Sequence, residues 1–300
     1  MLNRITRRIS SAIVNRNSLI FNLWYDKMAQ PVVSHAATDP EIDLIVGEIR
    51  KNGVAVMKNV FPAEFVEEVK AELEKGIAGS DAAFQNAPPD LLRVDRPEEG
   101  IIFSQNFKDC GRQMIDWIDL ATMPAPIRKF ASEPRFMEIV RRYWHVDPST
   151  IHVGGVRLTP CPTDDAWHID SICDQMKVML CVSEVTSDNG PMIYKLKTHD
   201  HPRVLHDWYF NAYRYGKSDA YGKKSAENRK GSDYAGLGNI QAESICLAGK
   251  PGDCFVFDTR GVHMASACKQ GTRWVAIAGY ALETRRNRAL VSLKKPGNAF

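Results

Sequence analysis

The sequence predicts an α+β, mainly β protein whose core is a double-stranded β-helix, or jelly roll, braced by helices near the N-terminus. Two observations predict this fold. Apolar residues recur at helical spacing before about residue 150, and short β-rich segments separated by turn signals follow it. Helices followed by about eight antiparallel strands are typical of two sheets that pack face to face.

The elements before residue 150 are predicted from periodicity and from helix-breaking residues. Gly53 ends the first helix, in which Ile42, Ile45, Val46 and Ile49 recur with helical spacing. A composition rich in Ala, Asp, Pro and Glu predicts an exposed loop at 78–100. The remaining predicted elements are a strand at 54–60, an amphipathic helix at 62–77 and helices around 112–120 and 133–144.

The strands after residue 150 are separated by turn signals such as Asp188-Asn189-Gly190-Pro191. Residues 203–238 interrupt this pattern with many aromatic, basic and glycine residues, which predicts an insertion or a lid over a substrate. The β-rich segments are IHVGGVRLT, AWHID, KVMLCVSEV, MIYKL, ESICL, DCFVF, VHMASA and RWVAIAGYAL.

Composition excludes several classes of protein. A formal net charge of +3 over 300 residues is too small to indicate a nucleic-acid-binding protein. The seven cysteines form no CxxC pair, which argues against a zinc ribbon, and several lie in apolar runs, so buried free thiols are expected. No stretch approaches the ~20 apolar residues that a transmembrane helix requires.

The predicted boundaries are a basic N-terminal extension at 1–39, one domain at 40–285 and a C-terminal tail at 286–300. Residues 1–25 contain arginines but no acidic residue. This pattern fits a helix with a solvated basic face, a transit peptide or an amphipathic helix on a membrane or partner. A cytoplasmic location is expected, with a mitochondrial one as the alternative if the segment is a transit peptide. The sequence does not indicate the oligomeric state.

The segment AWHID contains the first two candidate metal ligands. Residues two apart on a strand project to the same face, so His168 and Asp170 would converge on one point. His263 is the best third ligand, because a late strand in a jelly roll can return beside an early one. Two histidines and one carboxylate leave coordination positions open, as in non-haem Fe(II) oxygenases.

An arginine ten residues beyond His263 suits an organic anion. If the segments around His263 and Arg273 form a hairpin in which opposed residue numbers add up to 540, both side chains share one face with Ala265, Val275 and Ile277. An arginine among such residues is costly unless an anion meets it, and its planar fork suits a carboxylate. A dicarboxylate such as 2-oxoglutarate would fit between the metal and Arg273.

These residues resemble the phytanoyl-CoA dioxygenase family of Fe(II)/2-oxoglutarate-dependent oxygenases. The resemblance covers roughly residues 40 to 282. It includes the H-x-D pair, the distal histidine and the later arginine, together with the stretches GVAVMKNVFPAEFVEEVKAEL, WHID and SDNGPMIYKLKTHD. The resemblance implies Fe(II), 2-oxoglutarate and O2 as cofactor and cosubstrates, with CO2 and succinate as co-products of an oxidised small organic substrate.

The resemblance also implies individual roles. His168, Asp170 and His263 would bind iron, Arg273 would bind 2-oxoglutarate, and Thr159 would contact that cosubstrate. Related halogenases replace the carboxylate by glycine or alanine, so the aspartate favours hydroxylation. The chain departs from the family at residues 195–199, where the family's Pro-Gly-Ser-His ending is absent, and at Ile193 and Ala265, where some members carry Trp and Ser.

Two other classes of protein remain open from the sequence. One is a cupin-like protein whose metal is structural or serves a redox-neutral reaction, and the other is a non-catalytic binding module on the same fold. Three further histidines, His199, His201 and His206, are expected in a solvated loop rather than in a second metal site. Arg157 shares a strand face with Thr159 and could bind an acidic substrate.

Overall fold

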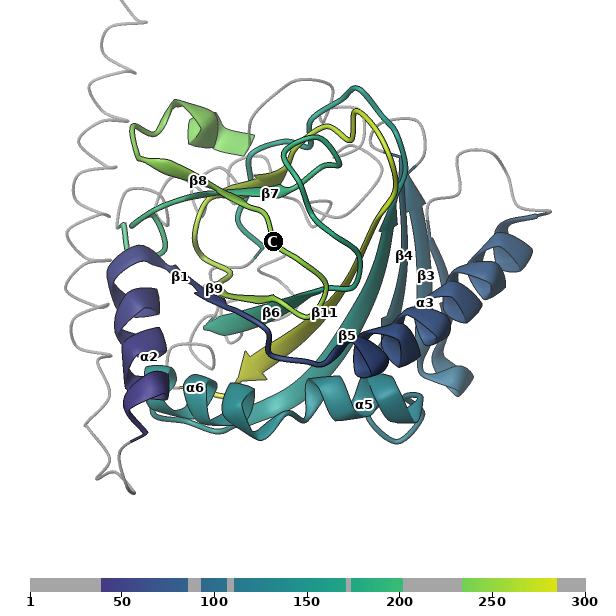
Figure 1. Ribbon diagram of the computed structural model, residues 1–300, viewed down its shortest axis with the longest axis horizontal. Coiled ribbons are helices and arrows are strands. Elements are labelled where there is room, and N and C mark those ends of the chain that lie inside the picture. Colours follow the sequence, from purple (N-terminus) through teal and green to yellow (C-terminus); the bar gives the residue numbers. More distant parts are fainter. Residues whose placement is uncertain (1–38, 86–92, 107–110, 171–173, 202–233, 285–300) are drawn as a thin grey trace, which may run out of the picture.

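The computed structural model describes residues 39–85, 93–106, 111–170, 174–201 and 234–284, which form two antiparallel sheets with helices (Figure 1). Within these residues the larger sheet has eight strands in the order β1-β9-β6-β11-β5-β4-β3-β2, and the smaller has three in the order β10-β7-β8. The predicted jelly roll is therefore confirmed. The strands are β1 (Val54–Met57), β2 (Arg93–Arg96), β3 (Ile101–Asn106), β4 (Arg112–Trp117), β5 (Pro148–Leu158), β6 (Gln175–Cys181), β7 (Met192–Lys195), β8 (Ser244–Leu247), β9 (Cys254–Asp258), β10 (His263–Ala265) and β11 (Arg273–Leu282).

The first described helix shows how local sequence sets an element's ends. The Asp39 carboxylate accepts hydrogen bonds from the backbone amides of Glu41 and Ile42, at 3.1 and 3.4 Å, and so caps the helix. Gly53 ends it in a left-handed conformation with φ of 87°, which favours glycine. The helices are α2 (Pro40–Asn52), α3 (Ala63–Phe84), α5 (Ala125–Ala131) and α6 (Pro134–Trp144), with short 3-10 helices η1 (Pro97–Glu99) and η3 (Tyr234–Asn239).

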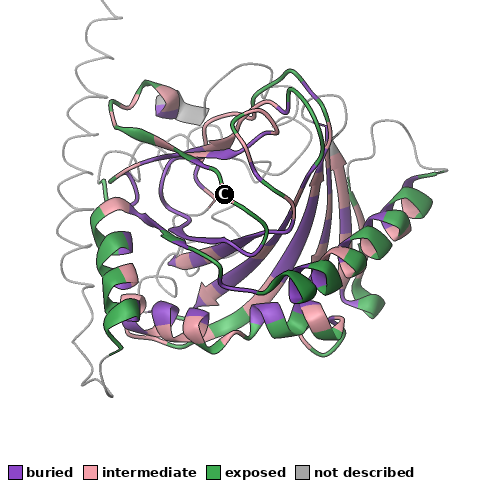
Figure 2. Ribbon diagram, viewed as in Figure 1, coloured by how far each residue is buried: buried purple, intermediate pink, exposed green. Residues whose placement is uncertain are grey.

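The larger sheet separates two hydrophobic cores. On its outer face, Ala276, Ala278 and Tyr280 of β11 lie in the core beneath the helices. On its inner face, Val275 lies in the core between the two sheets, and Ile277 packs against that core. The central strands of the larger sheet are largely buried in Figure 2, whereas the outward faces of α2 and α3 are exposed. The inner face is therefore the wall on which functional side chains can gather.

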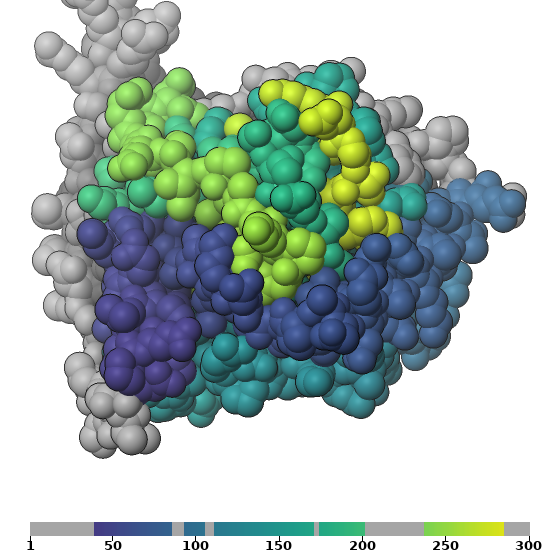
Figure 3. Space-filling model, in the orientation of Figure 1, coloured from purple at the N-terminus to yellow at the C-terminus, as the bar shows by residue number. Residues whose placement is uncertain are grey.

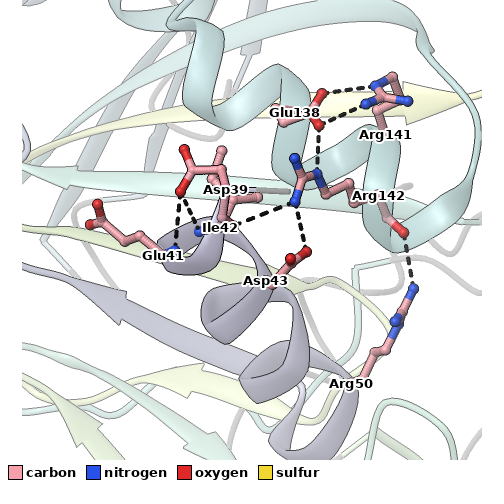
Figure 4. A network of polar contacts seen from close by, with 8 residues as sticks. All are labelled: Asp39, Glu41, Ile42, Asp43, Arg50, Glu138, Arg141 and Arg142. Atoms are coloured by element: carbon pink, nitrogen blue, oxygen red, sulfur yellow. Dashed lines mark hydrogen bonds and ion pairs between the residues drawn. The ribbon is translucent and has the colours of Figure 1, made fainter. Parts of the chain in front are cut away.

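A buried arginine fixes α2 to α6 (Figure 4). Arg142 of α6 lies 2.7 Å from Asp43 of α2 and 2.5 Å from Glu138 of its own helix. Its backbone carbonyl accepts a hydrogen bond of 3.0 Å from Arg50 of α2. Charge-assisted hydrogen bonds of this kind are directional. Because α2 leads directly into β1, the contact also sets where the edge of the larger sheet begins.

The helices form a continuous surface on one side of the molecule. In Figure 3, α2 and α3, in purple and blue, adjoin α5 and α6, in teal. No helix in the described part of the chain is long and apolar enough to cross a membrane. The predictions for residues 1–38, 203–233 and 286–300 lie outside the described residues.

The sequence prediction was wrong for the region before β5. Residues 112–117 form strand β4 rather than the start of a helix, because Gln113, Ile115 and Trp117 are buried on one face and the strand pairs with β3 and β5. The predicted loop at 78–100 was wrong in part, since α3 continues to Phe84 and β2 begins at Arg93. The apolar alternation in β4 is weak, and its pairing with β3 and β5 decides its conformation.

The predicted hairpin around Arg273 was also wrong. His263 belongs to the smaller sheet, where β10 pairs with β7, whereas β11 lies in the larger sheet between β5 and β6. The segment 266–272 connects the two sheets instead of turning back within one. The segment AWHID forms a single bridge, His168 to His263, rather than a full strand. His263 and Arg273 therefore reach the interior from different sheets.

The described cysteines are free thiols, and most are buried. Cys161, Cys181, Cys254 and Cys268 are buried, whereas Cys246 is exposed. Burial raises the pKa of the Cys181 thiol to about 12, which keeps this group protonated and unreactive at neutral pH. The expectation of buried free thiols holds for these four residues and is wrong for Cys246.

Candidate metal centre

The structure brings together the three residues that the sequence identified as metal ligands. The ligand atoms of His168, Asp170 and His263 all lie within 4.8 Å of one another. His168 Nε2 is 3.8 Å from Asp170 Oδ1, and His263 Nε2 is 3.5 Å from Asp170 Oδ2. The three side chains form a compact group that one metal ion could contact.

Backbone pairing sets the two histidines side by side. The His168 amide donates to the His263 carbonyl, and the His263 amide donates to the His168 carbonyl, both at 2.9 Å. Such a reciprocal pair places the two side chains on the same face of the ladder. The ring centroids are 4.5 Å apart. Asp170 follows two residues later and is held by a hydrogen bond of 3.0 Å from its amide to the Thr259 carbonyl.

Both imidazoles are oriented by a backbone carbonyl two residues earlier in the chain. His168 Nδ1 lies 2.7 Å from the Ala166 carbonyl oxygen, and His263 Nδ1 lies 2.8 Å from that of Gly261. A neutral imidazole that donates from Nδ1 has its lone pair on Nε2, the nitrogen nearest Asp170 in each ring. Metal-binding histidines are commonly held by this kind of contact.

The electrostatics of the site favour an ionised Asp170 and a neutral His168. Burial opposes ionisation of Asp170, but Lys177, with Nζ 3.1 Å from Asp170 Oδ2, and the two histidines hold the pKa of this carboxyl well below its usual range. Burial lowers the pKa of His168, and His263 lowers it further. These are the protonation states in which both residue types bind metal ions.

A buried ionic network lies directly before His263 in the chain. Arg260 is 3% exposed and lies 2.6 Å from Asp258 and 3.3 Å from Asp174. Its guanidinium also stacks over the Trp144 ring at 4.4 Å. Tyr143 donates a hydrogen bond of 3.0 Å to Asp258. The network holds the turn between β9 and β10 and so fixes the position of His263, the first residue of β10.

Gly261 packs against Tyr194 in this turn. A Cβ atom at position 261 would overlap the Tyr194 ring and hydroxyl, and Tyr194 is fully buried with its hydroxyl donating to the Asp258 carbonyl at 3.0 Å. The ring of Tyr194 also stacks on His263, with centroids 6.2 Å apart and an interplanar angle of 12°. The small size of Gly261 therefore allows Tyr194 to support His263.

Gly261→Ala is expected to destabilise the protein by about 3 kcal/mol, because overpacking in a rigid core costs free energy. Urea unfolding measures this change. Gly47→Ala is the matched control, since a Cβ atom there meets nothing within 4 Å and alanine is favoured in a helix by about 1 kcal/mol. Equal free energies of unfolding for the two variants would contradict the packing argument.

Arg273 lies on the inner wall of the larger sheet. It is 5% exposed, faces Leu158 across the β5–β11 ladder and shares its side of β11 with Val275. Its guanidinium donates a hydrogen bond to the Gly190 carbonyl. Gly190 has φ of 80°, so the turn that ends before β7 presents its carbonyl to the arginine. The structure thus places a buried cation on the same inner face of the larger sheet from which Lys177 reaches Asp170.

The structure sets Thr159 apart from these residues. Its hydroxyl donates to the Gly111 carbonyl at 3.0 Å, just beyond the end of β5. Arg157, on the same face two residues earlier, stacks over the Trp274 ring at 5.8 Å and lies 3.8 Å from Asp81 of α3. That face looks away from Arg273, so the structure shows no contact between Thr159 and the candidate metal centre.

Sequence reasoning missed several residues around the site. Lys177 of β6 reaches Asp170. The only sequence signal for its role was a charged residue on the strand face that also carries Met179 and Cys181. Phe257 lies against His263 with ring centroids 5.6 Å apart, within the apolar segment DCFVF that predicted no role. Both residues lie on strands whose partner strands could not be predicted from the sequence.

The expectation of a solvated histidine loop was wrong for His199. This residue is 3% exposed, and burial lowers the pKa of its imidazole. His201 is exposed, and His206 lies outside the described residues.

The fold and the site together define a jelly-roll protein with a candidate metal centre of two histidines and one carboxylate. The family model of phytanoyl-CoA dioxygenase (PhyH) matches residues 49–272, which is most of the chain. The chain therefore belongs to the phytanoyl-CoA dioxygenase (PhyH) family, and the resemblance seen in the sequence is confirmed.

Solved structures share the fold at low sequence identity. The non-heme alpha ketoglutarate dependent carbocyclase SnoK from nogalamycin biosynthesis has a TM-score of 0.54 at 13% identity, covering 91% of this chain and 96% of that chain. The epimerase SnoN from the same biosynthesis has a TM-score of 0.52 at 16% identity, covering 81% and 83%. A prolyl-4-hydroxylase from Pseudomonas putida has a TM-score of 0.51 at 11% identity, covering 81% and 100%. A search of curated proteins finds no match.

Proposed function

We propose that this chain is an Fe(II)- and 2-oxoglutarate-dependent oxygenase that hydroxylates a small organic substrate and forms succinate and CO2. The observation that carries the proposal is the convergence of His168, Asp170 and His263, with ligand atoms within 4.8 Å of one another, in the barrel that also contains Arg273. Membership of the PhyH family supports it. So does a fold shared with enzymes described as alpha ketoglutarate dependent.

The residues present fit an iron ion. Two imidazole nitrogens and one carboxylate are the donor set of non-haem Fe(II) oxygenases, which keep positions open for a chelating cosubstrate and O2. The donation of both Nδ1 atoms to backbone carbonyls leaves Nε2 of His168 and His263 to bind the metal. Iron with 2-oxoglutarate supplies the oxidising chemistry when bound, and the protein supplies position and enclosure.

The chain's own residues have separate tasks in this proposal. His168, Asp170 and His263 hold the metal at the junction of the two sheets. Arg273 pairs with the far carboxylate of 2-oxoglutarate, because a guanidinium fork matches a carboxylate and this one is buried at the inner wall. Lys177 keeps Asp170 ionised, and Tyr194 and Phe257 shield one side of His263 from water.

Asp170 supports hydroxylation rather than halogenation. In the halogenases related to this family a small residue takes the place of the carboxylate, which leaves a position for chloride, whereas this chain keeps the aspartate beside both histidines. The fold also serves an epimerase and a carbocyclase. Product analysis therefore decides the outcome on the substrate, separately from the test for iron and 2-oxoglutarate.

The first test is spectroscopic. Anaerobic addition of Fe(II) and then 2-oxoglutarate is expected to produce a metal-to-ligand charge-transfer band in the visible spectrum. Zn(II) in place of Fe(II) gives no such band and serves as the control. A protein that binds iron but shows no band with 2-oxoglutarate would overturn the proposed function. In air, a panel of small organic compounds is then screened for succinate formation and for hydroxylated product.

Arg273→Ala is expected to weaken 2-oxoglutarate binding about 10- to 100-fold, the loss typical of a charge-assisted hydrogen-bonding partner. Titration of the charge-transfer band measures the dissociation constant, and the band is expected to return at high 2-oxoglutarate. Arg157→Ala is the matched control, because this arginine lies on the opposite face of the larger sheet. Unchanged affinity in Arg273→Ala would contradict the assignment of this residue.

A further inference from the structure

Two glycines on the inner wall of the larger sheet accommodate polar side chains from the neighbouring strands. Gly154 of β5 is the partner of Asp116 of β4, and a Cβ atom at position 154 would lie 2.7 Å from Asp116 Oδ1. Gly279 of β11 is the partner of His152 of β5, and a Cβ atom at position 279 would overlap the His152 ring. Both polar side chains therefore lie close against a glycine, in positions that a Cβ atom would block.

Strand register places this wall beside the candidate ligands. Asp116 and His152 share a face because Asp116 opposes Gly154, which is two residues from His152 on β5. Gly279 also opposes Lys177 of β6. Lys177 in turn reaches Asp170 at 3.1 Å. The wall thus runs from Asp116 past His152 to the carboxylate of the candidate metal centre.

Asp116 has no protein partner on this wall. Among the described residues none forms a hydrogen bond or an ion pair with its carboxylate, and the residue is partly exposed. Burial raises the pKa of Asp116 to about 6, against the opposing effect of Lys177, Arg93 and Arg112. The carboxylate is thus held in a poorly solvated position without a donor from the protein, yet it is accessible. A donor from outside the protein can therefore reach it.

We propose that Asp116 and the glycine-floored wall around it form a substrate-binding subsite that accepts a hydrogen bond from a hydroxyl group of the substrate. The proposal rests on the proposed function, because the metal centre identifies the interior as the reaction chamber. An anionic group is disfavoured, since it would meet the carboxylate. A hydroxyl is favoured over an ammonium group because Lys177, Arg93 and Arg112 already surround Asp116 with positive charge.

The test uses four probes of similar size: cyclohexanol, cyclohexylamine, cyclohexanone and cyclohexanecarboxylate. Each is added anaerobically to protein loaded with Fe(II) and 2-oxoglutarate. Binding is measured by the shift of the charge-transfer band and by paramagnetic relaxation of the probe's proton NMR signals. Cyclohexanol is expected to bind about 10-fold more tightly than cyclohexanone, which has no donor, and than the other two probes.

The variants separate a direct contact from a change in folding. Asp116→Leu is expected to lose the preference for cyclohexanol while its charge-transfer band stays intact. Asp116→Asn keeps a hydrogen-bond acceptor and is expected to retain part of the preference for cyclohexanol. Asp147→Leu removes a carboxylate from an exposed turn and is expected to bind as the parent does.

Three results would overturn the subsite: equal preference in Asp116→Leu and the parent, tighter binding of cyclohexylamine, cyclohexanone or cyclohexanecarboxylate to the parent, or no binding of any probe. These differ from failure of the proposed function, in which the parent protein itself would show no charge-transfer band with Fe(II) and 2-oxoglutarate.

Discussion

Asp170→Ala is expected to abolish the charge-transfer band with Fe(II) and 2-oxoglutarate and to lower substrate-dependent succinate formation more than about 100-fold. Outer contacts of a metal ligand already contribute about 10- to 100-fold to affinity or activity, so loss of the ligand itself costs more. The substitution removes the anion closest to both histidines and leaves Lys177 without the carboxylate at 3.1 Å. Two imidazoles beside a lysine, without a carboxylate, are a poor site for a divalent cation.

The measurement pairs the anaerobic spectrum with metal content by elemental analysis. Asp147→Ala, in the exposed turn before β5, is the control and is expected to match the parent. Circular dichroism checks that Asp170→Ala is folded, because the backbone bridge between His168 and His263 does not depend on the carboxylate. A variant that still binds iron and shows the parental band would show that Asp170 is not a ligand.

Arg260→Met is expected to lower the free energy of unfolding by about 3–5 kcal/mol. The substitution leaves two buried carboxylates, Asp258 and Asp174, without the guanidinium that lies 2.6 and 3.3 Å from them. Breaking a buried ion pair from one side costs this amount because a charge remains uncompensated in the interior. The stacking of Arg260 over Trp144 is lost as well. Urea unfolding at neutral pH measures the change.

The pH dependence of this loss has a defined sign. Burial opposes ionisation of Asp258, yet Arg260 holds the pKa of Asp258 below its usual value. A carboxyl with a lowered pKa stabilises the folded state at neutral pH and loses that contribution as the pH falls through the folded-state pKa. The difference in free energy of unfolding between the parent and Arg260→Met is therefore expected to become smaller as the pH falls.

Arg260→Lys and Arg128→Met complete the comparison. Lysine keeps the charge but not the planar fork, so an intermediate loss is expected. Arg128 is exposed on α5, and its replacement is expected to change the free energy of unfolding by less than about 0.5 kcal/mol. If Arg260→Met is too unstable to purify, Arg260→Lys still shows a partial loss. A loss below about 1 kcal/mol in Arg260→Met would contradict the role of the network.

The parts of the site that could be predicted from sequence are those that depend on local geometry. His168 and Asp170 are two residues apart in extended chain, so their convergence follows from alternation alone. Arg273, Val275 and Ile277 occupy every second position of β11 and therefore share one face. This identifies the face of Arg273 without reference to a partner strand. The late position of His263 in the β-rich region was enough to select it from the other histidines.

The parts that could not be predicted depend on which strands meet. The hairpin expected around residues 269–271 is locally plausible, but the chain instead crosses from the smaller sheet to the larger one, and β11 finds its partners in β5 and β6. Lys177 and Asp116 gain their importance only from that pairing. β4 carries apolar residues that suit either a helix or a strand, and its two neighbours decide the outcome.

The reciprocal bridge between His168 and His263 joins two segments that are far apart in the chain, and β10 itself is only three residues long. A metal ion bound by His168, Asp170 and His263 would hold the segment 168–170 to β10. At a metal concentration 100 times the dissociation constant, binding would add about 2.7 kcal/mol to the folded state. Proteases act on opened molecules, so copies that lack metal would be degraded first. Metal supply would then determine the lifetime of the protein as well as its activity.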